Sequence, residues 1–132
     1  GCRMSDSDDL RKTAALIVRL SVEVERRLSS HVSDLRQGDV TVRGAYYVPG
    51  CICECEEILR DLHYNVVVDP YITLGYIQQM CRSRWERYAE LYNSYWNEEL
   101  RDVVEGRMDT VGWFNGRLDA ILADLRERSV KE

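Results

Sequence analysis

The amino-acid sequence predicts an all-α protein, a compact helical bundle with a central aromatic-rich helix. Apolar residues recur every three or four positions along most of the chain, which is the spacing of amphipathic helices. Only 2 prolines and 8 glycines occur among 132 residues, of which 45% are hydrophobic. We therefore expect one domain, residues 1–132, whose core is large enough to fold without disulfides or a structural metal.

The first predicted helix covers residues 10–35. Asp6, Asp8 and Asp9 precede it, where acidic side chains favour the positive end of a helix, and Gly38 is expected to end it. Its apolar positions, separated by charged residues, are Leu10, Ala14, Ile17, Leu20, Val24, Leu28, Val32 and Leu35.

Residues 1–9 are expected to form a disordered tail, in which Gly1 is an added residue ahead of a native start at Met4. No signal peptide is recognised, and the longest apolar stretch, "AALIV", is far too short to span a bilayer. These features predict a soluble, cytoplasmic protein with reduced thiols and no transmembrane anchor.

The middle of the chain is predicted to contain a loop and a second helix. "GDVTVRGAYYVPG", residues 38–50, mixes glycines with β-branched residues and favours a loop. Pro49 fits the first turn of a helix, because an amide missing there has no partner within the helix anyway. This second helix is expected to end at Asp61 or Tyr64, followed by an extended connector at residues 65–70, "NVVVDP".

Three further helices are predicted, over residues 70–82, 85–106 and 108–128. Pro70 opens the first of them, and Gly106 is expected to end the second. The second carries an unusually wide aromatic stripe, which indicates either a central position in the bundle or the wall of a groove for a partner. The stripe consists of Trp85, Tyr88, Tyr92, Tyr95 and Trp96.

The net charge and the motifs of the sequence argue against two classes of function, nucleic-acid binding and catalysis. The formal net charge of -5 argues against nucleic-acid binding, which needs a basic surface to displace counterions. The sequence has no Gly-rich phosphate loop, nucleophile elbow or histidine pair at metal spacing, so we expect neither an enzyme nor a cofactor. A protein partner is the preferred interpretation.

The stretch "CICEC" raises the question of a metal site. In a helix, Cys51 and Cys55 lie on one face while Cys53 points away from them. A closed zinc site needs four convergent ligands, and only His31 and His63 are available besides the thiols. We interpret Cys51 and Cys55 as small buried hydrophobes and expect no metal. An intermolecular disulfide is the main alternative.

Several fragments, in order, resemble Bcl-2-like proteins. In "VPGCICECEEIL", Val48, Ile52, Cys55 and Leu59 are spaced by four, three and four residues, with Glu57 between the last two. This is similar to the second helix of the family, where four hydrophobic positions flank an acid.

Two later fragments extend the resemblance. "PYITLGYIQQMCRSRWERYAELY" resembles the fourth helix running into the fifth, with Trp85, Glu86 and Arg87 in place of the family's Trp-Gly-Arg. "GRMDTVGWFNGRLDAILADL" is similar to the sixth helix. The resemblance is to compact viral members of the kind found in large DNA viruses such as iridoviruses, and it covers roughly residues 10 to 128.

The resemblance implies a Bcl-2-like bundle that inhibits apoptosis. Such proteins hold the amphipathic death-motif (Bcl-2 homology 3) helix of a pro-apoptotic partner in a hydrophobic groove. By position, Arg87 would pair with the ligand's aspartate. The residues expected at the groove are Arg87, Trp85, Tyr88, Leu59, Leu62, Leu74, Ile77 and Met80.

Two alternatives remain open. A second register aligns "FNGRLDAIL" with the family motif and gives the groove role to Arg117, but leaves too short and too charged a segment for the remaining helices. The other alternative is a structural bundle that self-associates, as a homodimer, through its aromatic surface and has no ligand groove.

Overall fold

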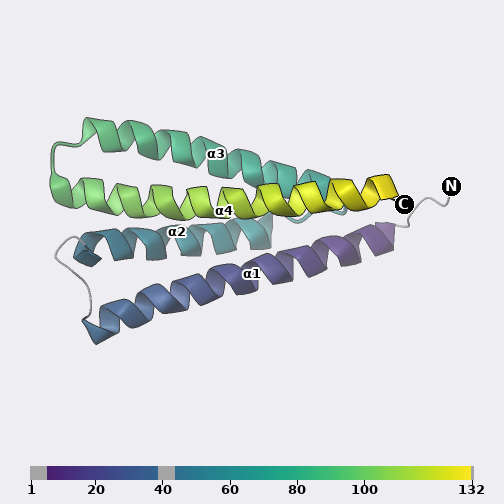
Figure 1. Ribbon diagram of the computed structural model, residues 1–132, viewed down its shortest axis with the longest axis horizontal. Coiled ribbons are helices and arrows are strands. Elements are labelled where there is room, and N and C mark those ends of the chain that lie inside the picture. The colour runs from purple at the N-terminus through teal and green to yellow at the C-terminus, as the bar shows by residue number, and fades with distance from the viewer. Residues whose placement is uncertain (1–5, 39–43, 132) are drawn as a thin grey trace.

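The computed structural model describes residues 6–38 and 44–131, and the regular structure in these residues is helical. Its helices are α1 (Asp6–Gln37), α2 (Gly44–Tyr64), α3 (Pro70–Ser94) and α4 (Glu98–Lys131). Successive helices run in opposite directions and form an up-and-down bundle (Figure 1). The predicted helical bundle is confirmed, but the described residues form four helices rather than the five that we predicted.

α2 and α4 lie in the middle of the arrangement. α2 packs against α4, while α3 packs on the other side of α4 and α1 on the other side of α2 (Figure 1). α1 also approaches the start of α3, where the Thr13 hydroxyl of α1 donates a hydrogen bond of 2.8 Å to the carbonyl oxygen of Val68. The bundle therefore closes at the end where α1 begins.

A continuous apolar core runs through the bundle. α1 contributes few fully buried residues, whereas α2, α3 and α4 each contribute several. The fully buried apolar side chains include Leu20, Val24, Cys55, Ile58, Leu62, Leu74, Ile77, Cys81, Val111, Phe114 and Leu118. Burying one such Leu, Ile or Phe side chain stabilises the fold by about 1.5–3 kcal/mol.

The bounds of α1 follow the sequence signals at its end more closely than at its start. Gly38 adopts φ 68°, a left-handed conformation that favours glycine, and its amide donates to the carbonyl of Leu35 at 3.3 Å. The predicted end at Gly38 is confirmed. At the other end, residues 6–9 are already helical, so the predicted disordered tail was too long. Residues 1–5 lie outside the described residues.

α2 begins earlier than predicted. Residues 44–50 are helical, and Pro49 lies inside α2 instead of in its first turn, so the loop prediction was wrong for this stretch. Residues 39–43 lie outside the described part of the chain. Burial explains the difference, because Val48, Gly50 and Cys51 all pack inside the bundle and tertiary contacts outweigh the cost of the proline.

α3 starts where the sequence predicts. Pro70 is its first residue, and the Asp69 carboxylate accepts a hydrogen bond of 3.0 Å from the amide of Ile72. Residues 65–69 form the predicted connector, which the Thr73 hydroxyl holds through 3.0 Å bonds with both the amide and the carbonyl of Val67.

The end of α3 and the start of α4 differ from the prediction. α3 continues to Ser94, and the chain turns at residues 95–97. The Asn97 side chain there accepts hydrogen bonds from the amides of Glu99 and Leu100, at 2.9 and 3.3 Å, and so caps α4. Gly106, predicted to end a helix, lies within α4.

Two glycines allow α2 and α4 to approach closely. A Cβ atom on Gly50 would overlap the carbonyl oxygen of Val103, and one on Gly106 would overlap that of Tyr47. The backbones therefore pack against each other without intervening side chains. Gly106 is a packing residue and not a helix terminator.

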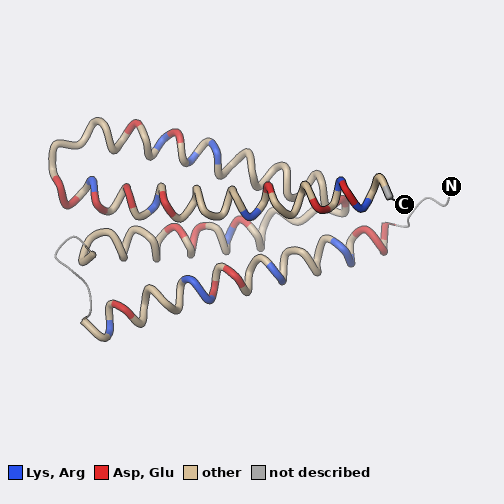
Figure 2. The backbone as a smooth tube through the Cα atoms, viewed as in Figure 1, with Lys and Arg blue, Asp and Glu red and all other residues tan. Residues whose placement is uncertain are grey.

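Polar contacts attach α1 to α4. Arg117 donates to both carboxylate oxygens of Glu23, at 2.8 and 3.3 Å, and the guanidinium of Arg27 lies 4.4 Å from the centre of a Trp113 ring. Residues of both charges are interspersed along the helices (Figure 2). The middle of α2 is mainly acidic, and this acidic segment faces arginines of other helices.

Candidate functional site between α2 and α3

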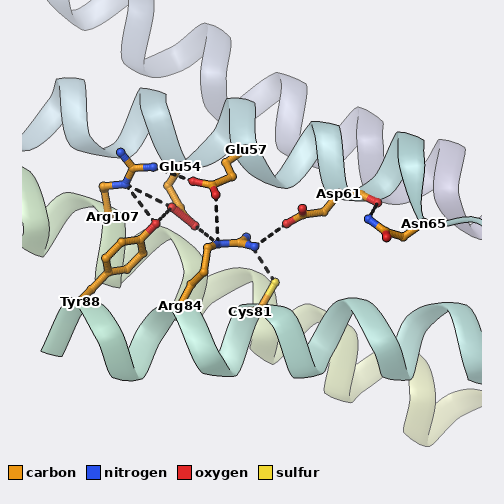
Figure 3. Close-up of polar contacts among 8 residues, drawn as sticks. All are labelled: Glu54, Glu57, Asp61, Asn65, Cys81, Arg84, Tyr88 and Arg107. Carbon is orange, nitrogen blue, oxygen red and sulfur yellow. Dashed lines mark hydrogen bonds and ion pairs between the residues drawn. The ribbon is translucent and has the colours of Figure 1, made fainter. Parts of the chain in front are cut away.

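A buried carboxylate lies at the centre of the bundle's main polar cluster. Glu54 of α2 is 0% exposed, and its oxygens accept hydrogen bonds from Arg84 at 3.0 Å, from the hydroxyl of Tyr88, and from Arg107 at 3.3 Å (Figure 3). These donors come from α3 and α4. One side chain of α2 thereby connects three helices.

Two more carboxylates extend this cluster along α2. Glu57 accepts a 2.6 Å hydrogen bond from Arg107, and Asp61 forms a 2.6 Å ion pair with Arg84 (Figure 3). Helical spacing explains why they share a face, because residues three, four or seven apart lie on one side of a helix. We call Glu54, Glu57, Asp61, Arg84, Tyr88 and Arg107 the Glu54 network.

Burial and neighbouring charges shift the pKa values of several side chains in this network. Burial disfavours the charged form of Arg84, but the carboxylates of Glu54 and Asp61 outweigh it and raise its pKa. Burial and the hydrogen bond to Glu54 both raise the pKa of Tyr88, so its hydroxyl stays protonated and donates. Burial also raises the pKa of Asp61, although the positive charge of Arg84 acts in the opposite direction and lowers it. The guanidiniums therefore hold the carboxylates in place between the helices.

The cysteines have different environments. Cys51 and Cys55 are 2% and 0% exposed, which confirms that they are buried, whereas Cys53 is exposed. Cys81 lies beside the network with its Sγ 3.7 Å from Arg84, yet burial raises its pKa to about 12. The buried thiols therefore remain protonated at neutral pH. No group of three or more His, Cys, Asp or Glu side chains in the described residues is arranged to hold a metal.

A surface groove lies over the network. Its volume is about 520 Å³, and we call it the α2–α3 groove. Its lining residues are Glu57 and Asp61 of α2 and Tyr76, Gln79, Met80, Ser83 and Arg84 of α3. Long ionic side chains cross this gap, and the backbones of α2 and α3 do not pack closely as those of α2 and α4 do. The space between the two helices explains the groove.

The structure distributes the predicted groove residues over four locations, which are the α2–α3 groove, the Glu54 network, the core and the outside of the bundle. Met80 lines the α2–α3 groove, and Tyr88 lies beneath it in the Glu54 network. Leu59 is partly buried against the core. The apolar residues that lie in the core with 0% exposure are Leu62, Leu74 and Ile77. These three have no surface to offer a ligand in this structure.

The remaining predicted residues lie on the outside of the bundle. Trp85 is 43% exposed and packs beside Gly112 of α4, away from the groove. Arg87 is exposed on α3, and Arg117 is engaged with Glu23 of α1. The aromatic stripe is also divided, because Tyr88 is buried while Trp96 lies beyond the end of α3 and is 92% exposed.

Sequence reasoning missed the Glu54 network. We predicted no role for Glu54, Asp61, Arg84 and Arg107. A signal was present, since Arg84 and Tyr88 are four residues apart and form one face of α3 opposite the three acids. However, only the fold brings Arg107 beside Glu54, from 53 residues away.

Comparisons of the chain with protein-family models, curated proteins and solved structures gave no match. Among the described helices, none combines the length and the apolar character that crossing a membrane requires.

Proposed function

We propose that the chain is a non-enzymatic binding protein that holds an amphipathic helix of a partner protein in the α2–α3 groove. The resemblance to compact viral Bcl-2-like proteins suggests that this partner helix is the death-motif helix of a pro-apoptotic protein. Sequestering that helix would inhibit apoptosis. The observation that carries the proposal is the groove of about 520 Å³ between two helices, whose lining includes Tyr76 and Met80.

The side chains of Tyr76 and Met80 in the groove lining support a helical ligand. Tyr76 is 54% exposed and Met80 is partly buried, and both lie on one side of α3. Ser83 and Arg87 follow on the same side, seven and eleven residues after Tyr76, so a line of surface side chains runs along the helix. An apolar stripe of a ligand helix packs well against such a line.

Arg87 is the arginine that we assign to the ligand's carboxylate. Arg84 is closer to the groove, but Glu54 and Asp61 already hold it at 3.0 and 2.6 Å. Arg87 is exposed and lies one turn beyond Ser83. A guanidinium suits a carboxylate because its donors are planar and permanently charged. This assignment keeps the predicted role of Arg87 and leaves Leu62, Leu74 and Ile77 in the core beneath the groove.

Self-association is the second candidate function. Trp96, in the connection between α3 and α4, is 92% exposed, and a nearly bare indole on a surface is a common anchor of protein interfaces. A homodimer formed through Trp96 would need no groove. The two candidate functions predict different oligomeric states and place the binding residues in different parts of the bundle.

A peptide titration tests the proposal. We expect a fluorescent death-motif peptide to bind the full chain saturably, with a Kd of about 1 μM or lower, corresponding to ~8 kcal/mol. Arg87→Ala should weaken binding by ~1.5–3 kcal/mol, the range for hydrogen bonds to charged groups, and Arg87→Lys should restore part of it. Arg82→Ala is the control, because Arg82 is also exposed on α3 but faces Asp119 of α4.

The outcomes separate the two candidates. Loss of binding in Arg87→Ala with normal binding in Arg82→Ala supports the groove. If the wild type binds no death-motif peptide and sediments as a dimer that Trp96→Ala converts to a monomer, self-association replaces the proposal. Equal weakening by both arginine substitutions would indicate a general charge effect and contradict the role of Arg87.

A further inference from the structure

A second cavity lies at the other side of the bundle, where α1 begins and α4 ends. Its volume is about 520 Å³, within the range of roughly 300–1,000 Å³ that is typical of small-molecule sites. It is bounded by α1, by the start of α3 and by the end of α4, and it shares no residue with the α2–α3 groove. Nothing in the proposed function uses it.

The inner part of this cavity is apolar. Leu16 of α1 and Leu125 of α4 line it and pack against the core, and Pro70 is buried beside them. The Tyr71 ring forms another part of the lining, and its hydroxyl donates a 3.0 Å hydrogen bond to the carbonyl of Leu125. This bond connects α3 to α4 and satisfies the hydroxyl of Tyr71. The part of Tyr71 that remains for a ligand is therefore its apolar ring.

The outer part of the cavity is mainly basic. Lys12, Arg19 and Arg128 line it and are exposed, and two partly buried acids, Asp9 and Asp69, also line it. The local formal charge is therefore three positive minus two negative, or +1, in a chain whose net charge is -5. The Asp69 carboxylate already accepts a hydrogen bond from the first turn of α3 at 3.0 Å.

We propose that this cavity binds a small amphipathic anion, a monocarboxylate with an apolar tail. The tail lies against Leu16, Pro70 and Leu125, and the carboxylate is held at the rim by Arg19 and Arg128. Arg128 forms a 3.3 Å ion pair with Asp124, in which both side chains are more than half exposed. Such a pair contributes little, so Arg128 can exchange it for a ligand carboxylate.

Both parts of the cavity are needed for this assignment. An inorganic anion would use the guanidiniums and leave the apolar lining in water. A neutral apolar molecule would fill the lining and gain nothing from the basic rim. A carboxylate with an apolar tail satisfies both, because it pairs with a planar guanidinium and buries apolar surface at once.

Calorimetric titration of decanoate into the full chain tests the proposal. We expect saturable binding with one decanoate per chain, at least tenfold tighter than decanol and with no comparable binding of inorganic phosphate. The double variant Arg19→Ala/Arg128→Ala should lose at least tenfold in decanoate affinity. Ala15→Trp should abolish binding, because Ala15 lines the cavity and is exposed, so the indole fills the site without entering the core.

Ala14→Trp is the matched control, since Ala14 is exposed on α1 but does not line the cavity. It should bind decanoate normally, and thermal unfolding should show the same Tm for both tryptophan variants. Equal affinity for decanol, or full affinity in the double arginine variant, would overturn the assignment of an anionic head group. Unchanged binding in Ala15→Trp would overturn the location. If phosphate binds as tightly as decanoate, the site recognises only the negative charge, and the proposed role of the apolar tail is wrong.

Discussion

At the scale of single residues, Glu54 connects α2 to both α3 and α4. Its carboxylate is fully buried and is held by Arg84, Tyr88 and Arg107. The sequence could not predict this, because an acid in a helical pattern looks the same whether it faces water or a buried arginine. Burying an ion pair gains little over apolar packing, but removing one partner leaves the other charges buried and unpaired.

Replacement of Glu54 should therefore be strongly destabilising. We expect Glu54→Ala to lower the free energy of unfolding by about 3–5 kcal/mol, measured by urea denaturation. Glu56→Ala is the matched control, because Glu56 is on the same helix but exposed, and it should stay within about 0.5 kcal/mol of the wild type. Similar effects of the two substitutions would show that the Glu54 network does not hold the helices together.

The buried thiols predict a loss of stability in alkaline solution. Burial raises the pKa of Cys55 to about 11 and that of Cys81 to about 12, above about 8.5 in an unfolded chain. Between these values the folded protein binds more protons than the unfolded one, so its stability falls as pH rises. We expect the free energy of unfolding to fall above about pH 9, by up to roughly 1.4 kcal/mol per pH unit for each thiol.

The double variant Cys55→Ala/Cys81→Ala isolates this effect. It should be less stable than the wild type at pH 7, because two buried side chains are shortened, but its stability should depend less on pH between 9 and about 11. Urea denaturation at several pH values measures both quantities. An equally steep pH dependence in the variant would exclude the thiols of Cys55 and Cys81 as its cause.

At the scale of secondary structure, local signals predicted some helix ends and not others. Gly38 and Pro70 were interpreted correctly, because a left-handed glycine that ends a helix and a proline that opens one act within a single turn. Gly106 was misinterpreted as a terminator, since its role depends on the backbone of Tyr47, which approaches from another helix. Asn97 was missed although Glu98 and Glu99 follow it, a recognisable N-terminal pattern.

The close approach of α2 and α4 predicts opposite effects for two glycine substitutions in α4. Gly106→Ala should destabilise the protein by about 1–3 kcal/mol, because its Cβ would overlap the Tyr47 carbonyl and push the helices apart. Gly116→Ala should stabilise it by roughly 0.5–1 kcal/mol, because a Cβ there meets open space and alanine favours the helix. Urea denaturation of both variants tests this, and a stabilising Gly106→Ala would contradict the packing described for α2 and α4.

At the scale of the whole molecule, the order of packing explains where the α2–α3 groove lies. α4 packs closely with α2 and α3, whereas α2 and α3 are connected through the side chains of the Glu54 network. The gap above that network is the α2–α3 groove. Helical periodicity predicted the bundle, but it could not show that Leu62, Leu74 and Ile77 face inward while Met80 lines a groove, because that choice depends on which helices become neighbours.

We propose above that a partner helix lies in the α2–α3 groove. The most direct measurement is the change in amide chemical shifts of the isotopically labelled full chain during titration with an unlabelled death-motif peptide. We predict that the largest changes lie in residues 57–64 of α2 and 76–87 of α3, and that the outer face of α1 stays unchanged. Saturable changes concentrated on α1 or around Trp96, or no changes at peptide concentrations well above 1 μM, would contradict the claim.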